Sequence, residues 1–459
     1  MSAPLLWIIL PGLFAVILLL FSRWFLLNTV LAALVSFILF GAGVLIPVGS
    51  EISIGSFIFV VQSSMTVLGR EILIQQANLP EVTIIYFGMG LWILGGYPIR
   101  LARVFPALAL GTAALLVAAL SVQPFLYAAV FIELAALILI PILVQAGAEV
   151  GSGVLRMISF YTIGMSAILF VGWMITETSS VFVVTDIQFR AGFLLALGFM
   201  FLLAVFPLHS WVPMIIYQSK PYAAAFFVFW LTYAALFFAH DLIHTYEWIQ
   251  TNLDLQNILI WAGIFIVVSN GILMMFQRNL GRILGHALLA ETGFVLLAAS
   301  INTITGNELF YSLILRSIFP FILWAFCLSF IHSAYQDISF HSIVGAVKYM
   351  RWSILGMIAG QICVLGMPMF SLFPIKLALF QVLALDSQAL LIWLMIGIAG
   401  ALFTTIRVIG VTFQDVSASL PEIDEPKWLR WPVIIAIVWM FAGGLLPGLF
   451  LSLLVRLIV

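Results

Sequence analysis

Long apolar segments recur along the whole chain and are separated by short polar connections. A helix needs about 20 apolar residues to cross the hydrocarbon core of a bilayer. Candidate segments of this length are centred near residues 13, 36, 89, 112, 135, 165, 199, 232, 267, 292, 322, 361, 400 and 442. The pattern predicts an all-α polytopic membrane protein with about 14 transmembrane helices. We expect a single membrane domain over residues 1–459.

The composition agrees with this class of protein. Of the 459 residues, 64% are hydrophobic and only 8% are charged, and the net charge is −1. No basic surface points to a nucleic acid partner. The two cysteines, Cys327 and Cys363, lie in apolar stretches and form no CxxC pattern. We therefore expect no disulfide framework, no metal centre and no cofactor in this chain.

The positive charges are distributed unevenly over the predicted connections. Twelve of the 17 Lys and Arg residues fall in the odd-numbered connections and three in the others, while Arg316 and Lys376 fall inside predicted spans. Lys and Arg accumulate in the cytoplasmic loops of membrane proteins. The distribution predicts a multi-pass protein of the cell membrane (inner or plasma), with both termini on the non-cytoplasmic side. One polar stretch, residues 48–80, is long enough for a short hairpin or an interfacial segment.

Two predicted spans are interrupted by proline. The first interruption is FPLHSWVP, residues 206–213, and the second is LGMPMFSLFPIK, residues 365–376. Proline removes a backbone donor and clashes with the preceding turn. Non-helical backbone at membrane depth persists only inside protein or along a polar cavity. The residues expected at the two helix breaks are Pro207, His209, Pro213, Pro368 and Pro374.

An acidic residue precedes each break at a similar distance. Glu133 lies 74 residues before Pro207, and Glu291 lies 77 residues before Pro368. Interrupted helices at corresponding positions of two halves are typical of inverted-repeat transporters. We predict a first repeat half over residues 104–244 and a second over residues 256–412, with broken seventh and twelfth helices.

Four motifs, in this order, resemble one family. They are FIELAALILIP at 131–141, FPLHSWVP at 206–213, GRILGHALLAETGF at 281–294 and LGMPMFSLFPIK at 365–376. Over residues 85–412 the chain resembles the antiporter-like, proton-translocating membrane subunits of respiratory complex I (NADH:quinone oxidoreductase). Subunits of the same family also occur in multisubunit cation/proton antiporters and in membrane-bound hydrogenases. The resemblance implies a 14-helix fold and places an essential glutamate of the fifth helix on Glu133.

The chain also departs from the pattern that this family implies. Leu202 and Leu231 occupy positions where the family carries lysines on its seventh and eighth helices. Arg316 and Pro320 stand for a histidine and a lysine of the eleventh helix, and Glu291 stands for a histidine of the tenth. The family's lysines on the seventh and eighth helices would set the charge of Glu133. Because Leu202 and Leu231 stand in their place, we expect a degenerate first half-channel with Glu133 desolvated and without a nearby cation.

The candidate proton-path residues each have a structural alternative. Glu133 is interpreted as a relay relic or as a buried acid in a structural hydrogen bond. Glu291, Arg316 and Lys376 are expected to form a charged axis in the second half, acting either as a relay or as a static ion network. Arginine keeps its proton, so Arg316 would bias its neighbours without shuttling protons. His209 is expected to hydrogen-bond the loose backbone.

Three functions fit the sequence. The first is an antiporter-like subunit of an NADH dehydrogenase-like respiratory assembly, which couples remote redox chemistry to proton translocation. The second is a scaffold homologue that does not pump, and the third is a subunit of a multisubunit sodium/proton antiporter. In every case we expect other membrane subunits as partners, and protons, or alternatively sodium, as the transported ion. Any redox enzyme activity would reside in those other subunits.

The uneven distribution of positive charge predicts the outcome of a topology experiment. Reporter domains fused after Arg103, Arg282 and Lys427 should report the cytoplasm, and reporters at both termini should report the opposite side. Two or more reporters on the wrong side would contradict the span assignment.

Overall fold

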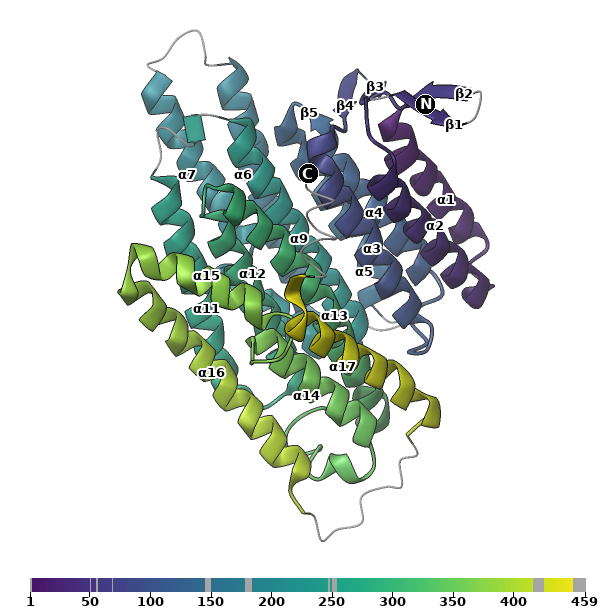
Figure 1. The fold of residues 1–459 in the computed structure, drawn as a ribbon, viewed down its shortest axis with the longest axis vertical. Helices are drawn as coiled ribbons and strands as arrows, with labels where there is room; N and C mark the ends of the chain where they lie inside the picture. Colours follow the sequence, from purple (N-terminus) through teal and green to yellow (C-terminus); the bar gives the residue numbers. More distant parts are fainter. Residues whose placement is uncertain are drawn as a thin grey trace.

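A computed structural model describes residues 2–49, 51–54, 57–67, 69–144, 150–177, 184–246, 248–249, 254–415 and 425–448. Helices dominate these residues (Figure 1). Ten of the described helices are long and apolar enough to cross a membrane, and five shorter apolar helices accompany them. The all-α polytopic class is therefore confirmed, whereas the number of 14 spans stays a prediction. Arg456, one of the charges used in the topology analysis, lies outside the described residues.

The N-terminal part holds three helices and two small β-sheets. The helices are α1 (Leu10–Leu20, preceded by the π-helix Leu5–Ile9), α2 (Phe25–Leu45) and α3 (Leu79–Gly96). The strands are β1 (Glu51–Ile54), β2 (Phe57–Val60), β3 (Ser64–Val67), β4 (Arg70–Leu73) and β5 (Val122–Gln123). β1 and β2 pair antiparallel, and β3, β4 and β5 form a second antiparallel sheet in that order. The hairpin expected within residues 48–80 is thus present.

The remaining helices follow the order expected for two related halves. The first set is α4 (Phe105–Ser121), α5 (Ala128–Leu143), α6 (Ser152–Glu177), α7 (Val184–Leu202), α8 (Trp211–Gln218) and α9 (Pro221–Thr245). The second set is α11 (Leu255–Phe276), α12 (Leu280–Ala299), α13 (Ile304–Tyr335), α14 (Arg351–Leu365), α15 (Phe373–Asp386) and α16 (Gln388–Phe413), and α17 (Arg430–Leu445) completes the described helices. α6 packs on α7 in the first set, as α13 packs on α14 in the second. The repeat boundaries themselves stay a prediction.

Both predicted helix breaks are present. α7 ends at Leu202, and helical structure resumes with the 3₁₀ turn Leu208–Ser210 and then α8. α14 ends at Leu365, and α15 begins at Phe373. Gly366 follows α14 with φ +74°, the left-handed conformation that commonly ends a helix and that glycine adopts without strain. Pro374 lies in the first turn of α15, where proline costs no hydrogen bond.

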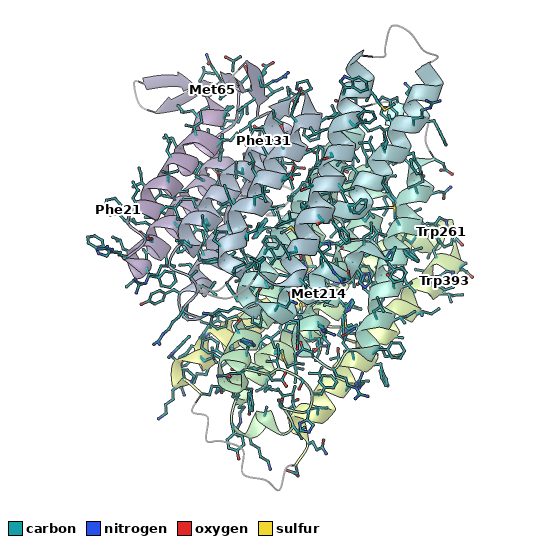
Figure 2. The ribbon with its side chains drawn as sticks, turned by 180° about the vertical axis from the view of Figure 1, so that it is seen from behind. Phe21, Met65, Phe131, Met214, Trp261 and Trp393 are labelled. Atoms are coloured by element: carbon teal, nitrogen blue, oxygen red, sulfur yellow. The ribbon has the colours of Figure 1, made fainter. Side chains whose placement is uncertain are left out.

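α9 forms the centre of the molecule (Figure 1). The entire apolar window of α9 is buried, whereas only a minority of the residues in the windows of α2, α16 and α17 are buried. Large apolar side chains such as Phe21, Trp261 and Trp393 lie at the periphery (Figure 2) and are about half exposed. In a bilayer such faces contact lipid or other membrane subunits. The buried centre, rather than the periphery, therefore positions the polar residues.

α14 is held at its first turn by an acidic side chain from the connection before α17. The carboxylate of Glu425 accepts hydrogen bonds from the backbone N–H groups of Trp352 at 2.9 Å and Ser353 at 2.7 Å. The first N–H groups of a helix lack intrahelical acceptors, and a negative charge there also complements the helix dipole. Glu425 thus fixes the beginning of the helix whose other end forms the second break.

α11 and α16 approach each other closely at glycine residues. A side chain added at this crossing should therefore lower the free energy of unfolding. A Cβ atom on Gly271 would collide with the carbonyl group of Gly397, whereas a Cβ atom on Gly410 of α16 would meet nothing within 4 Å. We expect Gly271→Ala to lower the free energy of unfolding by about 1–3 kcal/mol through overpacking. The matched control Gly410→Ala should change it by less than about 0.5 kcal/mol. Denaturant unfolding in detergent measures both, and equal effects would contradict the close crossing.

Candidate functional site

A buried ion pair lies at the second helix break. Glu291 on α12 and Lys376, the fourth residue of α15, approach with Oε2 and Nζ 2.7 Å apart. Lys376 Nζ also donates to the Val364 carbonyl oxygen at 2.6 Å and lies 4.0 Å from the centroid of the Phe294 ring. Both charged side chains are almost completely buried. The structure therefore brings together two of the four predicted proton-path residues.

The break itself explains why lysine fits there. Because α14 ends at Leu365, its last carbonyl groups lack the N–H partners of a continuing helix. One of these carbonyls, that of Val364, accepts from Lys376, and the negative end of the α14 dipole favours a cation. A Cβ atom on Gly366 would lie 2.8 Å from Lys376 Cδ, so the glycine also leaves room for the lysine side chain.

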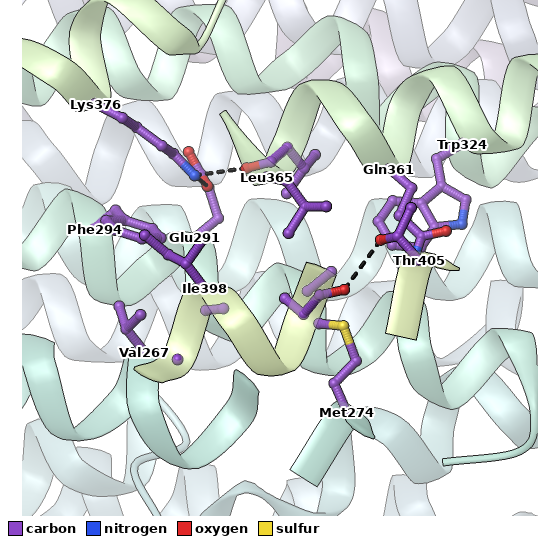
Figure 3. Close-up of a pocket in the computed structure, with 15 residues that line it drawn as sticks. Val267, Met274, Glu291, Phe294, Trp324, Gln361, Leu365, Lys376, Ile398 and Thr405 are labelled. Carbon is purple, nitrogen blue, oxygen red and sulfur yellow. Dashed lines mark hydrogen bonds and ion pairs between the residues drawn. The ribbon is translucent and has the colours of Figure 1, made fainter. Parts of the chain in front are cut away.

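A small cavity adjoins the ion pair (Figure 3). Its volume is about 30 Å³, and its lining is mostly apolar apart from Glu291, Lys376, Gln361 and Thr405. Glu291 Oε1 and Gln361 Nε2 are buried and make no hydrogen bond to a described protein group. A cavity of this size accommodates one or two water molecules. A water molecule in this cavity can therefore hydrogen-bond one of these buried groups.

Arg316 lies at the same break but contacts different groups. One of its guanidinium nitrogens, Nη1, donates to the carbonyl oxygens of Ser371 and Gly443, each at 3.0 Å, and Nη2 donates to the Pro447 carbonyl oxygen at 3.3 Å. These carbonyls belong to the loop before α15 and to the end of α17. The expected axis of Glu291, Arg316 and Lys376 therefore stays a prediction beyond the Glu291–Lys376 pair. Lys376 pairs directly with Glu291, whereas Arg316 binds the backbone that forms the break.

Glu133 contacts a polar side chain of the neighbouring helix. It lies on α5, is only partly buried, and accepts a hydrogen bond from Thr162 Oγ1 of α6 at 2.9 Å. Leu202 and Leu231, which stand where the family carries lysines, are fully buried. The expectation of a desolvated Glu133 without a nearby cation stays a prediction, because a partly exposed side chain on a membrane span faces lipid or another subunit as well as water. Its hydrogen bond to Thr162 fits the structural alternative.

The first helix break packs against α12. His209 stacks on Phe206, and its ring centroid lies 5.7 Å from that of His286, whose Nδ1 hydrogen-bonds Asn270 Oδ1 at 2.9 Å. A Cβ atom on Gly285 of α12 would lie 2.9 Å from Pro213 Cα, so the glycine permits this close approach. α12 thus touches the first break near residue 285 and the second break at Glu291. The contact of His209 with a ring on α12 was not expected from the sequence.

Sequence reasoning missed a second group of buried polar residues. Glu81 on α3 is fully buried and accepts a hydrogen bond from the Tyr311 hydroxyl of α13 at 3.1 Å. The carboxyl group of Asp241 on α9 lies beside it. Each acid lies near the end of an apolar span. The sequence of one span does not reveal which residue of another helix lies beside the acid. An acid inside the buried part of a predicted span was the only available signal.

The comparison with known families agrees with this architecture. Residues 173–404 match the sequence profile of the family described as NADH:quinone oxidoreductase/Mrp antiporter, TM. The chain belongs to this family. The matched region contains both helix breaks together with Glu291, Arg316 and Lys376. The family predicted from the four sequence motifs is thus confirmed.

Individual relatives are distant. NADH-quinone oxidoreductase subunit N 1 of Thermodesulfovibrio yellowstonii is 22% identical over 260 residues, which cover 55% of this chain and 55% of that protein. The chain thus spans about half the length of this curated relative. A chain of the Mrp complex from Dietzia sp. superposes with a TM-score of 0.76 at 14% identity, covering 100% of this chain and 96% of that one.

A chain of respiratory complex I from Thermus thermophilus superposes with a TM-score of 0.72 at 18% identity, covering 98% of both chains. At such low identities the superpositions show a shared fold alone. The fold is that of membrane subunits found in both kinds of assembly, and a multi-pass membrane protein is confirmed.

Proposed function

We propose that this chain is the antiporter-like membrane subunit of a complex I-type assembly, in which it moves protons through its second half while other subunits carry out redox chemistry. The observation that carries this proposal is the Glu291–Lys376 ion pair, which is buried at a helix break. Intramembrane acids and lysines are costly, and they commonly mark ion pathways. The family match and the relatedness to an NADH-quinone oxidoreductase subunit support the choice of assembly.

The ion pair can work as a two-state element. With both groups charged, Lys376 is held between Glu291 and the Val364 carbonyl. A proton arriving at Glu291 cancels its charge and removes the Coulomb attraction, so the flexible lysine side chain is then held by the carbonyl and the Phe294 ring alone. A desolvated lysine can release a proton in turn. Arg316 keeps its charge and maintains the backbone of the break throughout.

The first half lacks a comparable element among its described residues. Leu202 and Leu231 fill their positions with apolar side chains, and Glu133 is held by a threonine hydroxyl. We infer that the first half-channel is degenerate and that its helices serve packing. A chain in which the second half is equally inactive would be a scaffold, and a chain that moves sodium would work as an Mrp-like antiporter subunit.

The orientation and the partners belong to the same proposal. The positive-inside distribution favours both termini on the non-cytoplasmic side of the cell membrane. The exposed apolar faces of α2, α16 and α17 fit contacts with further membrane subunits as well as lipid. Mild-detergent purification is the natural way to recover such subunits together with this chain.

The proposed roles predict different effects of two substitutions. Lys376→Ala should lower proton uptake into vesicles at least about tenfold, as expected for one essential proton-carrying group. Glu133→Gln keeps an oxygen that accepts from Thr162, and we expect proton uptake to stay near the wild-type rate. Rates should be normalised to assembled complex. Loss of uptake in Glu133→Gln with normal uptake in Lys376→Ala would contradict a working second half and a degenerate first half.

The same vesicles separate the alternative functions. Wild-type uptake that depends on Na⁺ in the medium would favour the sodium/proton antiporter. Assembled wild-type complex whose proton uptake equals that of both variants would favour the scaffold.

A further inference from the structure

Two acids, Glu81 and Asp241, lie side by side where α3, α9 and α13 meet. They are separate from the Glu291–Lys376 ion pair. Glu81 belongs to the first turn of α3, Asp241 to the last turns of α9, and Tyr311 to the early part of α13. Tyr311 donates its hydroxyl hydrogen to Glu81 Oε1 at 3.1 Å, and the carboxyl group of Asp241 lies beside that of Glu81. Oε2 of Glu81 and Oδ2 of Asp241 are buried and accept no hydrogen bond from the N–H or O–H group of another described residue, so a hydrogen bond between the two carboxyl groups requires a proton on one of them.

No positive charge balances these acids among the described residues. Tyr311 from α13 donates to Glu81, and His240 and His244 on α9 line the same cavity as Asp241. The ring centroids of the two histidines lie 4.7 Å apart. Neither carboxyl forms an ion pair with a described Lys or Arg. Two adjacent buried carboxyl groups cannot both be ionised at ordinary cost, so the pair keeps at least one proton.

A large polar cavity reaches this pair from the protein surface. Its volume is about 410 Å³, and its lining includes Asp241, His240, His244, Tyr311, Gln123 and Asn307. Exposed residues near β4 and at the end of α9 border its opening, on the side of the molecule that carries the β-strands (Figure 1). Asp241 lines the cavity, whereas Glu81 is not among its lining residues. A cavity of this size and polarity admits many water molecules.

We propose that Glu81 and Asp241 form a proton-exchange site, in which the pair alternates between a neutral form that holds two protons and a form in which the two carboxyl groups share one proton. The step is a simple transfer: the Asp241 O–H bond breaks, a water molecule in this cavity accepts the proton, and the single negative charge left on the pair is stabilised by the remaining shared proton and by the Tyr311 hydroxyl, which donates to Glu81. The reverse transfer reloads the pair. A metal cation fits less well, because hard cations need several oxygen ligands around one point and Glu81 is sealed from the cavity.

The position of the acid pair links its proton exchange to proton transport through the second half. This link rests on the proposed function. α9 and α13, which carry Asp241 and Tyr311, also carry Tyr233 and Ser317, whose hydroxyl groups lie 3.0 Å apart nearer the middle of both helices. Tyr233 is close enough to Glu291 to interact with it electrostatically. The same two helices therefore border the ion pair and the acid pair. We infer that protons of the second half meet the aqueous phase on the β-strand side at this site.

Infrared difference spectroscopy tests the site without requiring transport. The purified complex is titrated with alkali while the carbonyl stretch of protonated carboxylic acids is recorded. Wild-type protein should lose one carboxylic-acid band on titration, and Glu81→Gln/Asp241→Asn should lack that band. Tyr311→Phe should keep the band to higher pH, because the lost hydrogen bond favoured the charged form. The control Glu308→Gln, a partly exposed acid one turn from Tyr311, should titrate like the wild type.

Three results would overturn the proposal. One is a wild-type spectrum identical to that of the double variant, provided that size-exclusion chromatography shows both to be assembled. Another is a spectrum of Asp241→Glu, which keeps the acid, that lacks the band although the variant is assembled. The third is a band that disappears on addition of NaCl but not of choline chloride at constant pH, which would make the pair a cation site. A titrating band in a complex that moves no protons would leave the site standing and contradict the proposed function alone.

Discussion

The ion pair between Glu291 and Lys376 determines how the second half of this protein is built. A single charge buried in a membrane protein is strongly unfavourable, so each of the two residues requires the other. Lysine additionally needs acceptors for its remaining hydrogens, and the end of α14 at Leu365 supplies one as the Val364 carbonyl. The helix break is therefore part of the same interaction. An uninterrupted helix would leave no free carbonyl at this depth.

Several other features maintain that arrangement. Arg316 binds the carbonyls of Ser371 and Gly443, which ties the loop of the break to the end of α17. Glu425 fixes the opposite end of α14. α12 carries Glu291, which contacts the second break, and His286, which contacts the first. A displacement of this one helix would therefore change the contacts at both breaks. α12 therefore connects the two helix breaks physically in the described structure.

The sequence predicted the parts of the fold that follow from local chemistry. Proline and glycine cluster at both interruptions, so the breaks after Leu202 and Leu365 could be located from the residues alone, although a single proline such as Pro320 lies inside the continuous helix α13. Partners across the fold could not be located in this way. Spacing along α13 does not reveal that Arg316 reaches the carbonyls of Ser371 and Gly443. The partial exposure of Glu133 was likewise hidden, because an apolar helix has no sequence mark that separates its core face from its lipid face.

The acid pair shows the same limit more clearly. Glu81 and Asp241 are separated by about 160 residues of sequence, each within an otherwise apolar helix, and only the packing of α3 on α9 places them together. A like-charge contact is also the opposite of what a search for ion pairs looks for. Buried acids that have no lysine within their own motif therefore merit examination in the folded structure before they are interpreted as solitary.

A double-mutant cycle on the ion pair tests the central claim most directly. The free energy of unfolding in detergent is measured for wild type, Glu291→Gln, Lys376→Met and the double variant. Removing Lys376 alone leaves a buried acid without its cation, which should cost about 3–5 kcal/mol if that acid stays ionised. The double variant should be more stable than Lys376→Met, because the unpaired acid is gone. Additive losses, with no recovery in the double variant, would show that the two residues act independently and would contradict the account.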